Sequence, residues 1–126
     1  MSPAGRNTLS KEERINGKKS IGALLEAGRW ISVPPVKCCF SVPNTQEFSR
    51  IMVSVPKKSF KRAVRRNYLK RIIRESYRTQ KGLLGGINAD MLFIYEGRSI
   101  CTYLQMKDTM AGILEKIAST ASDVQA

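Results

Sequence analysis

The stretch of twenty-five residues from Lys57 to Lys81 constrains this chain more than any other feature. It holds 11 of the 22 Lys and Arg residues and a single acidic residue, Glu75. From about Arg62 it lacks Pro and Gly until Gly82 and is rich in residues that favour helices. We therefore predict a basic helix of roughly five turns over this stretch.

The side chains of this predicted helix divide into two faces. At about 100° per residue, one side carries apolar and aromatic residues: Leu69, Ile72, Ile73 and Tyr77. The opposite stripe carries one amide and four cations: Asn67, Lys70, Arg71, Arg74 and Arg78. A solvated face usually mixes both signs of charge, whereas here only the pair Arg71–Glu75 relieves the repulsion. A polyanionic partner would offset that repulsion, so we interpret the stripe as a nucleic-acid-binding surface.

The composition supports this interpretation. The chain has 126 residues, 42% of them hydrophobic, and a formal net charge of +12, which predicts one globular domain with a nucleic-acid partner. An anionic membrane surface is the lesser alternative. No apolar run approaches the roughly 20 residues of a membrane span, and the N-terminus lacks the apolar segment of a secretory signal. We expect a cytoplasmic protein with no membrane partner.

The residues that most often carry catalysis are scarce. There is no histidine, and the three cysteines, Cys38, Cys39 and Cys101, have neither zinc-site nor disulfide-framework spacing, so we expect them to be reduced. The ten acidic residues form no DxD or ExxE cluster. We therefore predict no catalytic residue and no metal site in this chain.

The rest of the sequence predicts an α+β fold with one layer of sheet covered by helices. A short helix should begin after the N-cap candidate Ser20 and end at Gly28, and a last amphipathic helix should begin at a capping box formed by Thr102 and Gln105. Four strands are predicted, at 29–33, 36–42, 50–55 and 91–95.

The pairing and ends of these elements can also be predicted. We expect strands 36–42 and 50–55 to form an antiparallel hairpin around a turn at 43–46, and strand 91–95 to be buried on both faces. The folded domain should cover residues 15–119. A flexible basic tail, 1–14, would precede it, and a frayed end, 120–126, would follow it.

The basic stretch resembles a known signature. From Lys57 to Glu75 it reads KKxxKRAxxRNxxKRxxRE. This is similar to the arginine-rich motif of the bacterial ribonuclease P protein component, and the resemblance extends over residues 9–118. One departure is Tyr68, which stands where the family usually has the second arginine of an R-N-R motif. The tyrosine could replace that arginine by stacking, by its hydroxyl group, or could simply pack.

The resemblance implies both a fold and a function. The implied fold is a single αβββαβα domain with a mixed four-stranded sheet, as in the second domain of ribosomal protein S5, and a left-handed βαβ crossover, where sequence alone favours a right-handed one. The implied function is that of the RNA-binding subunit of the ribonuclease P endoribonuclease. Such a subunit binds the catalytic RNA and the 5′ leader of precursor tRNA and promotes endonucleolytic 5′-end maturation. The chemistry would come from the RNA and from Mg²⁺ held mainly by that RNA.

The charge pattern and the family resemblance both point to particular residues as candidates for RNA binding. The RNA-binding candidates lie in the basic stretch: Lys57, Lys58, Lys61, Arg62, Arg66, Asn67, Tyr68, Lys70, Arg71, Arg74 and Arg78. Arginine's planar fork suits phosphate, and Asn67 suits a hydrogen bond to one specific group. A cleft for the 5′ leader, between sheet and helix, would use Ile21 and Leu25 of the first helix and Phe40 as the stacking ring on the sheet.

Three other classes share some of these features. A structural ribosomal protein would have the same charge and size. A DNA-binding module would need a helix-turn-helix partner that this sequence does not offer. A protein-only nuclease is disfavoured by the missing histidines and carboxylate clusters. The sequence does not indicate an oligomeric state.

Overall fold

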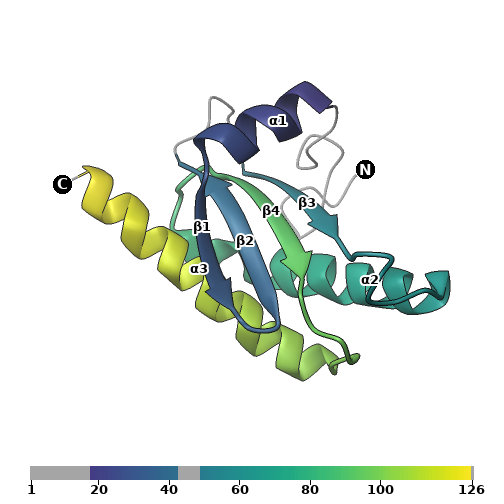
Figure 1. Cartoon of the computed structure of the whole chain (residues 1–126). Coiled ribbons are helices and arrows are strands. Elements are labelled where there is room, and N and C mark those ends of the chain that lie inside the picture. Colours follow the sequence, from purple (N-terminus) through teal and green to yellow (C-terminus); the bar gives the residue numbers. More distant parts are fainter. Residues whose placement is uncertain (1–17, 43–48, 126) are drawn as a thin grey trace, which may run out of the picture.

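The structure is a computed structural model that describes residues 18–42 and 49–125 (Figure 1). The predicted tail at 1–14 and the predicted turn at 43–46 lie outside the described residues. The elements follow the expected α+β order, with one additional short 3-10 helix, η2. They are α1 (Lys18–Ala27), β1 (Arg29–Val33), β2 (Val36–Ser41), β3 (Arg50–Ser54), α2 (Ala63–Gln80), η2 (Lys81–Leu84), β4 (Asp90–Tyr95) and α3 (Tyr103–Gln125).

The four strands form one mixed sheet in the order β1-β2-β4-β3. β2 is antiparallel to both of its neighbours, whereas β3 runs parallel to β4. The predicted hairpin between residues 36–42 and 50–55 is therefore wrong, because β4 lies between β2 and β3. The apolar run of β4 stabilises the fold most at the centre of the sheet, where both of its faces are covered.

Helices cover the two faces of the sheet unequally (Figure 1). α2 and α3 pack on one face, where Met91, Phe93 and Tyr95 of β4 join the main core. α1 packs on the other face, where Leu24 meets Cys39 and Leu92 in a smaller cluster. Alternate residues of β4 thus serve two cores, which confirms the expectation that this strand is buried on both sides.

The connection from β3 through α2 to β4 is left-handed. In Figure 1 both strands point downward, α2 lies behind the sheet, and the chain moves leftward from β3 to its parallel neighbour β4. This is the hand that the family resemblance implied and the opposite of the common preference.

The ends of the helices agree with the sequence in part. The capping box is confirmed. The backbone N–H of Gln105 donates to Thr102 Oγ1 at 3.2 Å, and the backbone N–H of Thr102 donates to Gln105 Oε1 at 2.9 Å. α1 begins at Lys18, so Ser20 lies inside the helix and is not its N-cap. Lysine is a good helix former, so positions 18 and 19 are compatible with helix before Ser20.

The last helix, α3, packs one long face against the core. Its buried face is formed by Met106, Met110, Ile113, Leu114 and Ile117. The backbone stays helical to Gln125, within the segment 120–126 where we expected fraying, and the fraying itself stays a prediction. None of the described helices combines the length and the low polarity that crossing a bilayer requires.

Candidate nucleic-acid interface

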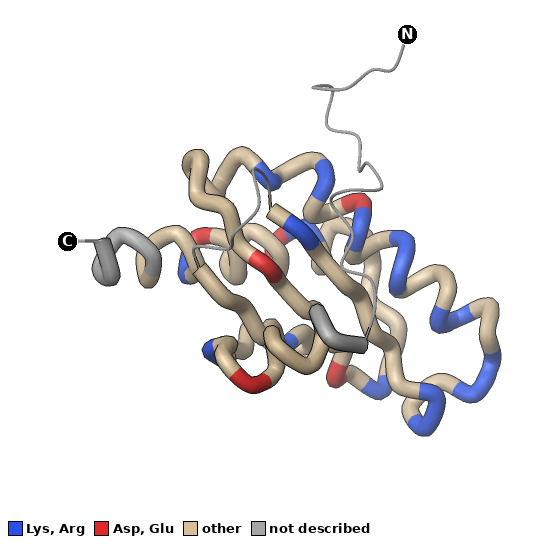
Figure 2. Tube along the Cα trace, turned by 90° about the horizontal axis from the view of Figure 1, so that it is seen from above, with Lys and Arg blue, Asp and Glu red and all other residues tan. Residues whose placement is uncertain are grey.

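α2 carries a cationic stripe on the side that faces away from the core. Its buried residues are Leu69, Ile72, Ile73, Ser76 and Tyr77. On the opposite side Asn67, Arg71 and Arg74 are exposed, and Lys70 and Arg78 are half-buried at its margins. In Figure 2 the Lys and Arg positions follow one another along α2 and the loop before it. The predicted division of this helix into a core face and a cationic face is confirmed.

Two cations of this stripe, Lys70 and Arg71, have no carboxylate partner within the described residues. Neither Lys70 nor Arg71 forms an ion pair with a described carboxylate, whereas Arg78 pairs with Glu75 through two hydrogen bonds, one of them 3.2 Å from Nε to Oε2. The hydrogen bond from Arg78 lowers the pKa of Glu75 below its usual value. The sequence predicts Arg71 as the partner of Glu75. Instead, the Arg71 guanidinium lies over the Tyr68 ring, 5.6 Å from its centre.

Arg66 is turned away from this stripe. Its Nη1 donates hydrogen bonds to the carbonyl oxygens of Phe60 at 2.7 Å and Lys61 at 2.9 Å. The guanidinium therefore joins α2 to the loop that precedes it. Of the residues predicted to bind RNA, Arg66 is the one whose hydrogen bonds hold other candidates in place.

The loop from residue 55 to 62 presents four further cations. It is anchored by Phe60, which is buried with its ring centre 5.8 Å from that of Tyr95. The amides of Ser59 and Phe60 both donate to the carbonyl of Pro56, which closes a tight turn. The exposed side chains on this turn and at the start of α2 are Lys57, Lys58, Lys61 and Arg62. They lie where the first amides of α2 also favour anions.

A hollow beside this loop adds a cation that the sequence analysis missed. It has a volume of about 410 Å³ and is lined by Lys58, Ser59 and Arg98. Arg98 lies just after β4 and Lys58 just after β3. Because β3 and β4 are parallel neighbours, the loops that follow them meet at the same edge of the sheet. Only this pairing, which the sequence did not reveal, brings the two cations together.

Tyr68 packs against the protein. Its side chain is half-buried beside the main core, and its hydroxyl donates to the carbonyl oxygen of Cys101 at 3.4 Å. Of the alternatives for this position, the structure supports packing and a hydroxyl contact within the chain.

The three residues nominated for a leader cleft do not share one surface. Leu25 on α1 is 44% exposed, and Ile21 packs against the small cluster around Leu24. Phe40 is only 1% exposed and belongs to the main core on the other face of the sheet, so its nomination as a stacking ring is wrong. Side chains alternate along a strand, and Phe40 points to the same side as Val36.

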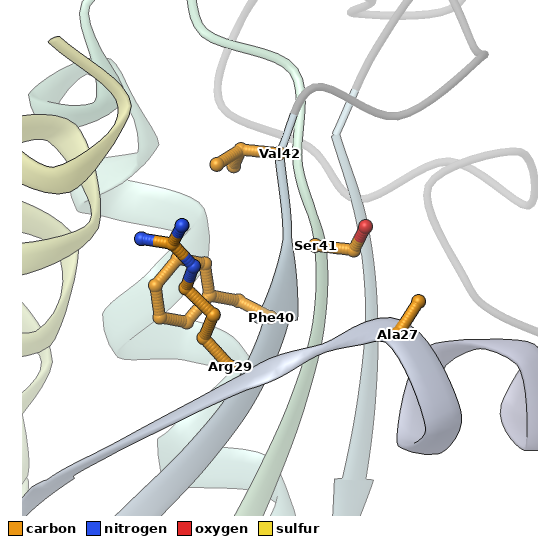
Figure 3. Close-up of a pocket in the computed structure, with 5 residues that line it drawn as sticks. All are labelled: Ala27, Arg29, Phe40, Ser41 and Val42. Carbon is orange, nitrogen blue, oxygen red and sulfur yellow. The ribbon is translucent and has the colours of Figure 1, made fainter. Parts of the chain in front are cut away.

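Phe40 borders a small hollow at the junction of α1 and β1 (Figure 3). The hollow has a volume of about 80 Å³ and is lined by Ala27, Arg29, Phe40, Ser41 and Val42. A space of this size has room for a small group but not for a nucleobase stacked on the Phe40 ring.

The open face of the sheet, beside α1, does carry an aromatic ring that the sequence analysis overlooked. Trp30 of β1 is 48% exposed, and the Lys37 ammonium lies 5.1 Å from the centre of its ring. Trp30 pairs in register with Cys39, which packs under Leu24 of α1. The side on which Trp30 lies is set by this cross-strand register, in which residues directly opposite each other share one face of the sheet.

Acidic side chains and thiols do not gather at this interface. Among the described residues, no three His, Cys, Asp or Glu side chains form a group that could hold a metal ion. The bidentate pair of Arg50 with Asp90, at 2.9 and 2.7 Å, joins β3 to β4 and has a structural role.

Comparisons with known proteins agree on one family. The sequence model of the family Ribonuclease P matches residues 9–118. The ribonuclease P protein component of Porphyromonas gingivalis is 37% identical over 81 residues, which are 63% of this chain and 59% of that protein. That of Petrotoga mobilis is 41% identical over 88 residues, 69% of this chain and 71% of that protein. The match thus spans about three fifths of the first relative's length.

Solved structures show the same fold. The ribonuclease P protein of Staphylococcus aureus superposes with a TM-score of 0.72 over 82% of this chain and 94% of that one, at 23% identity. The protein from Thermotoga maritima gives a TM-score of 0.73 over 83% and 97%, also at 23% identity.

Proposed function

Because the chain belongs to the Ribonuclease P family, whose sequence model matches residues 9–118, we propose that it is the RNA-binding protein subunit of a ribonuclease P holoenzyme. In this proposal its partners are a catalytic RNA and precursor tRNA, and the holoenzyme removes the 5′ leader of the tRNA in the cytoplasm. The Mg²⁺ that supports hydrolysis is held by the RNA, and no step of the chemistry is assigned to a side chain of this protein.

The cationic stripe of α2 and the loop before it carry this proposal. Arg71 is exposed and Lys70 is half-buried, and neither has a carboxylate partner among the described residues. The loop cations Lys57 and Lys58 extend the same basic region. Phosphates of a structured RNA would pair with these cations in place of carboxylates, and counterions would be released from the RNA. The protein thereby reduces repulsion between the catalytic RNA and its RNA substrate and lowers the Mg²⁺ concentration needed for both to associate.

The second part of the proposal concerns the leader. We assign it to the open face of the sheet beside α1, where Leu25 is exposed and Lys37 of β2 is partly exposed. Apolar contacts and a few cations can bind a single strand without strong sequence preference. The hollow between Lys58 and Arg98 offers two further positive charges for phosphates near the same sheet.

Reconstitution tests the proposal directly. Purified protein is combined with a cognate catalytic RNA, and cleavage of precursor tRNA is followed at low and high Mg²⁺ concentrations. We expect no cleavage by the protein alone and a marked stimulation of the RNA at low Mg²⁺. A double variant, Lys70→Ala with Arg71→Ala, should lose most of this stimulation, whereas Lys107→Ala with Lys116→Ala on α3 removes the same charge and should retain it.

The same assay separates this function from its main rival. A structural ribosomal protein would bind ribosomal RNA and leave tRNA processing unchanged. Absence of stimulation at every Mg²⁺ concentration, with a folded protein that still binds RNA, would therefore overturn the proposal.

A further inference from the structure

Three side chains from separate segments meet on the open face of the sheet. Lys37 Nζ lies 5.1 Å from the centre of the Trp30 ring and 3.4 Å from Oε2 of Glu96. Trp30 comes from β1, Lys37 from β2, and Glu96 directly follows β4. All three remain substantially exposed: Trp30 by 48%, and the side chains of Lys37 and Glu96 by 38% and 46%.

The backbone beneath this cluster is well fixed. Ser32 pairs with Lys37 in the β1–β2 ladder, and Lys37 pairs with Ile94 in the β2–β4 ladder. The Glu96 amide donates to the carbonyl of Pro35 at 2.7 Å, which ties the end of β4 to the turn between β1 and β2. The indole, the ammonium and the carboxylate are thus presented by rigid elements.

We propose that Trp30, Lys37 and Glu96 form a subsite for one nucleotide of a single-stranded RNA. The indole provides a stacking surface, and Lys37 provides positive charge for the adjoining phosphate. Glu96 provides carboxylate oxygens that accept hydrogen bonds from a base amino group. This inference rests on the proposed function and deepens it, because it adds a subsite at the β1 edge of the face assigned to the leader.

The chemistry of the cluster favours a single strand over other occupants. A large exposed ring costs free energy in water, and a stacked base would cover it. Bases in a duplex have their faces already stacked, so a double-stranded RNA could not use the indole in this way. An acidic protein segment could pair with Lys37 but its carboxylates offer no hydrogen-bond donor to Glu96, whereas a nucleotide offers a phosphate to Lys37 and a base amino group to Glu96.

The tryptophan itself reports on this subsite. Trp30 is the only tryptophan of the chain, so intrinsic indole fluorescence comes from this position alone. We expect a single-stranded RNA oligonucleotide to quench this fluorescence to saturation, with the same midpoint as binding measured by anisotropy of a labelled strand. A duplex of the same sequence should bind without this quenching. Binding of the single strand without quenching would overturn the subsite.

A second experiment uses the reconstituted holoenzyme and precursors that differ in leader length. Trp30→Ala should weaken binding of a long-leader precursor by at least about five-fold, the lower end for loss of one stacked base, and should not affect leaderless tRNA. Trp30→Phe should retain most of the affinity, and Leu104→Ala, which removes another exposed apolar side chain on α3, should retain all of it. An equal loss for both substrates would overturn the subsite.

A third variant addresses the role of Glu96. Adenine, cytosine and guanine bear an amino group, whereas uracil does not. Glu96→Gln should therefore change the ratio between the affinity for leaders with one of the first three bases at this subsite and the affinity for leaders with uracil there. A uniform change for all bases would contradict a hydrogen bond to the base.

The outcomes distinguish the subsite from the proposed function. If the wild-type protein stimulates cleavage but Trp30→Ala behaves like it with every leader, the subsite fails while the proposed function stands. If the wild-type protein does not stimulate cleavage, the proposed function fails instead.

Discussion

Arg66 reaches back across the start of α2 and donates a hydrogen bond from Nη1 to the carbonyl oxygen of Phe60 at 2.7 Å. The same nitrogen donates to the carbonyl of Lys61 at 2.9 Å. Since the Phe60 side chain is buried against Tyr95, this guanidinium links the basic helix, the basic loop and the core. A residue of the arginine-rich motif therefore positions its neighbours.

Replacing Arg66 should cost stability as well as RNA affinity. We expect Arg66→Gln to lower the free energy of unfolding by about 1 kcal/mol, because two carbonyl groups lose a charged donor while remaining near solvent. Urea unfolding followed by circular dichroism measures this. Lys61→Gln removes the same charge from an exposed side chain and should leave the stability nearly unchanged. An equal loss in both variants would attribute the effect to charge and contradict the role of the hydrogen bonds.

Two glycines, one within α1 and one directly after it, should respond oppositely to alanine. A Cβ at Gly28 would lie 2.5 Å from both Cys39 Sγ and the carbonyl oxygen of Leu24, so Gly28→Ala should destabilise the protein by about 1–3 kcal/mol. A Cβ at Gly22, within α1, would meet nothing within 4 Å, so Gly22→Ala should stabilise it by about 0.5–1 kcal/mol. Thermal melting of both variants tests this contrast, and a shift of the same sign would contradict it.

The three thiols should differ in reactivity. Burial raises the pKa of Cys38 and of Cys39, so both stay protonated above the pH at which a free thiol ionises. The folded state favours the protonated thiols, because their pKa values are higher there than in the unfolded chain. The free energy of unfolding should therefore decrease as the pH rises above the pKa of an unfolded cysteine. At pH 8 we expect a thiol reagent to modify only Cys101, which is half-buried, and all three cysteines in denaturant.

A matched variant checks this assignment. Cys101→Ser should leave the native protein unreactive on the same timescale while the denatured protein still reacts at two sites. Fast modification of the native variant would contradict the burial of Cys38 and Cys39.

The elements that could be predicted from sequence are those governed by local rules. The two faces of α2 follow from the spacing of its residues, and the capping box at Thr102 follows from a three-residue interval. β4 could be recognised as central by its continuous apolar run. Each of these signals is contained within one element.

The errors arose where a residue's role depends on another element. The pairing of β3 with β4, and with it the meeting of Lys58 and Arg98, is set by long-range packing that no local pattern encodes. The alternation of Phe40 with Cys39 separates the two faces of β2, but it does not say which of them the core helices cover. Trp30 was visible in the sequence, but its meeting with Lys37 and Glu96 requires the order of the strands.

The departure at Tyr68 can be tested by restoring the family residue. Tyr68 is half-buried beside the main core, and its hydroxyl bonds to the Cys101 carbonyl at 3.4 Å. Tyr68→Arg should therefore destabilise the protein by about 1–3 kcal/mol, because a cation replaces a packed ring. Tyr68→Phe keeps the ring and loses one long hydrogen bond, so it should cost less than about 1 kcal/mol. Unchanged stability of Tyr68→Arg, with tighter RNA binding, would show that this position faces RNA.

The salt dependence of RNA binding should report the number of phosphate contacts that the stripe makes. Arg71 is exposed on α2 and has no carboxylate partner among the described residues, so its replacement removes one cation without leaving an unpaired acid. We expect Arg71→Ala to weaken RNA binding several-fold and to reduce the slope of log K against log salt concentration by about one. Lys116→Ala removes an exposed cation from α3 and should leave the slope unchanged. If both variants lowered the slope equally, net charge alone would govern binding, and the stripe on α2 would not be the contact surface.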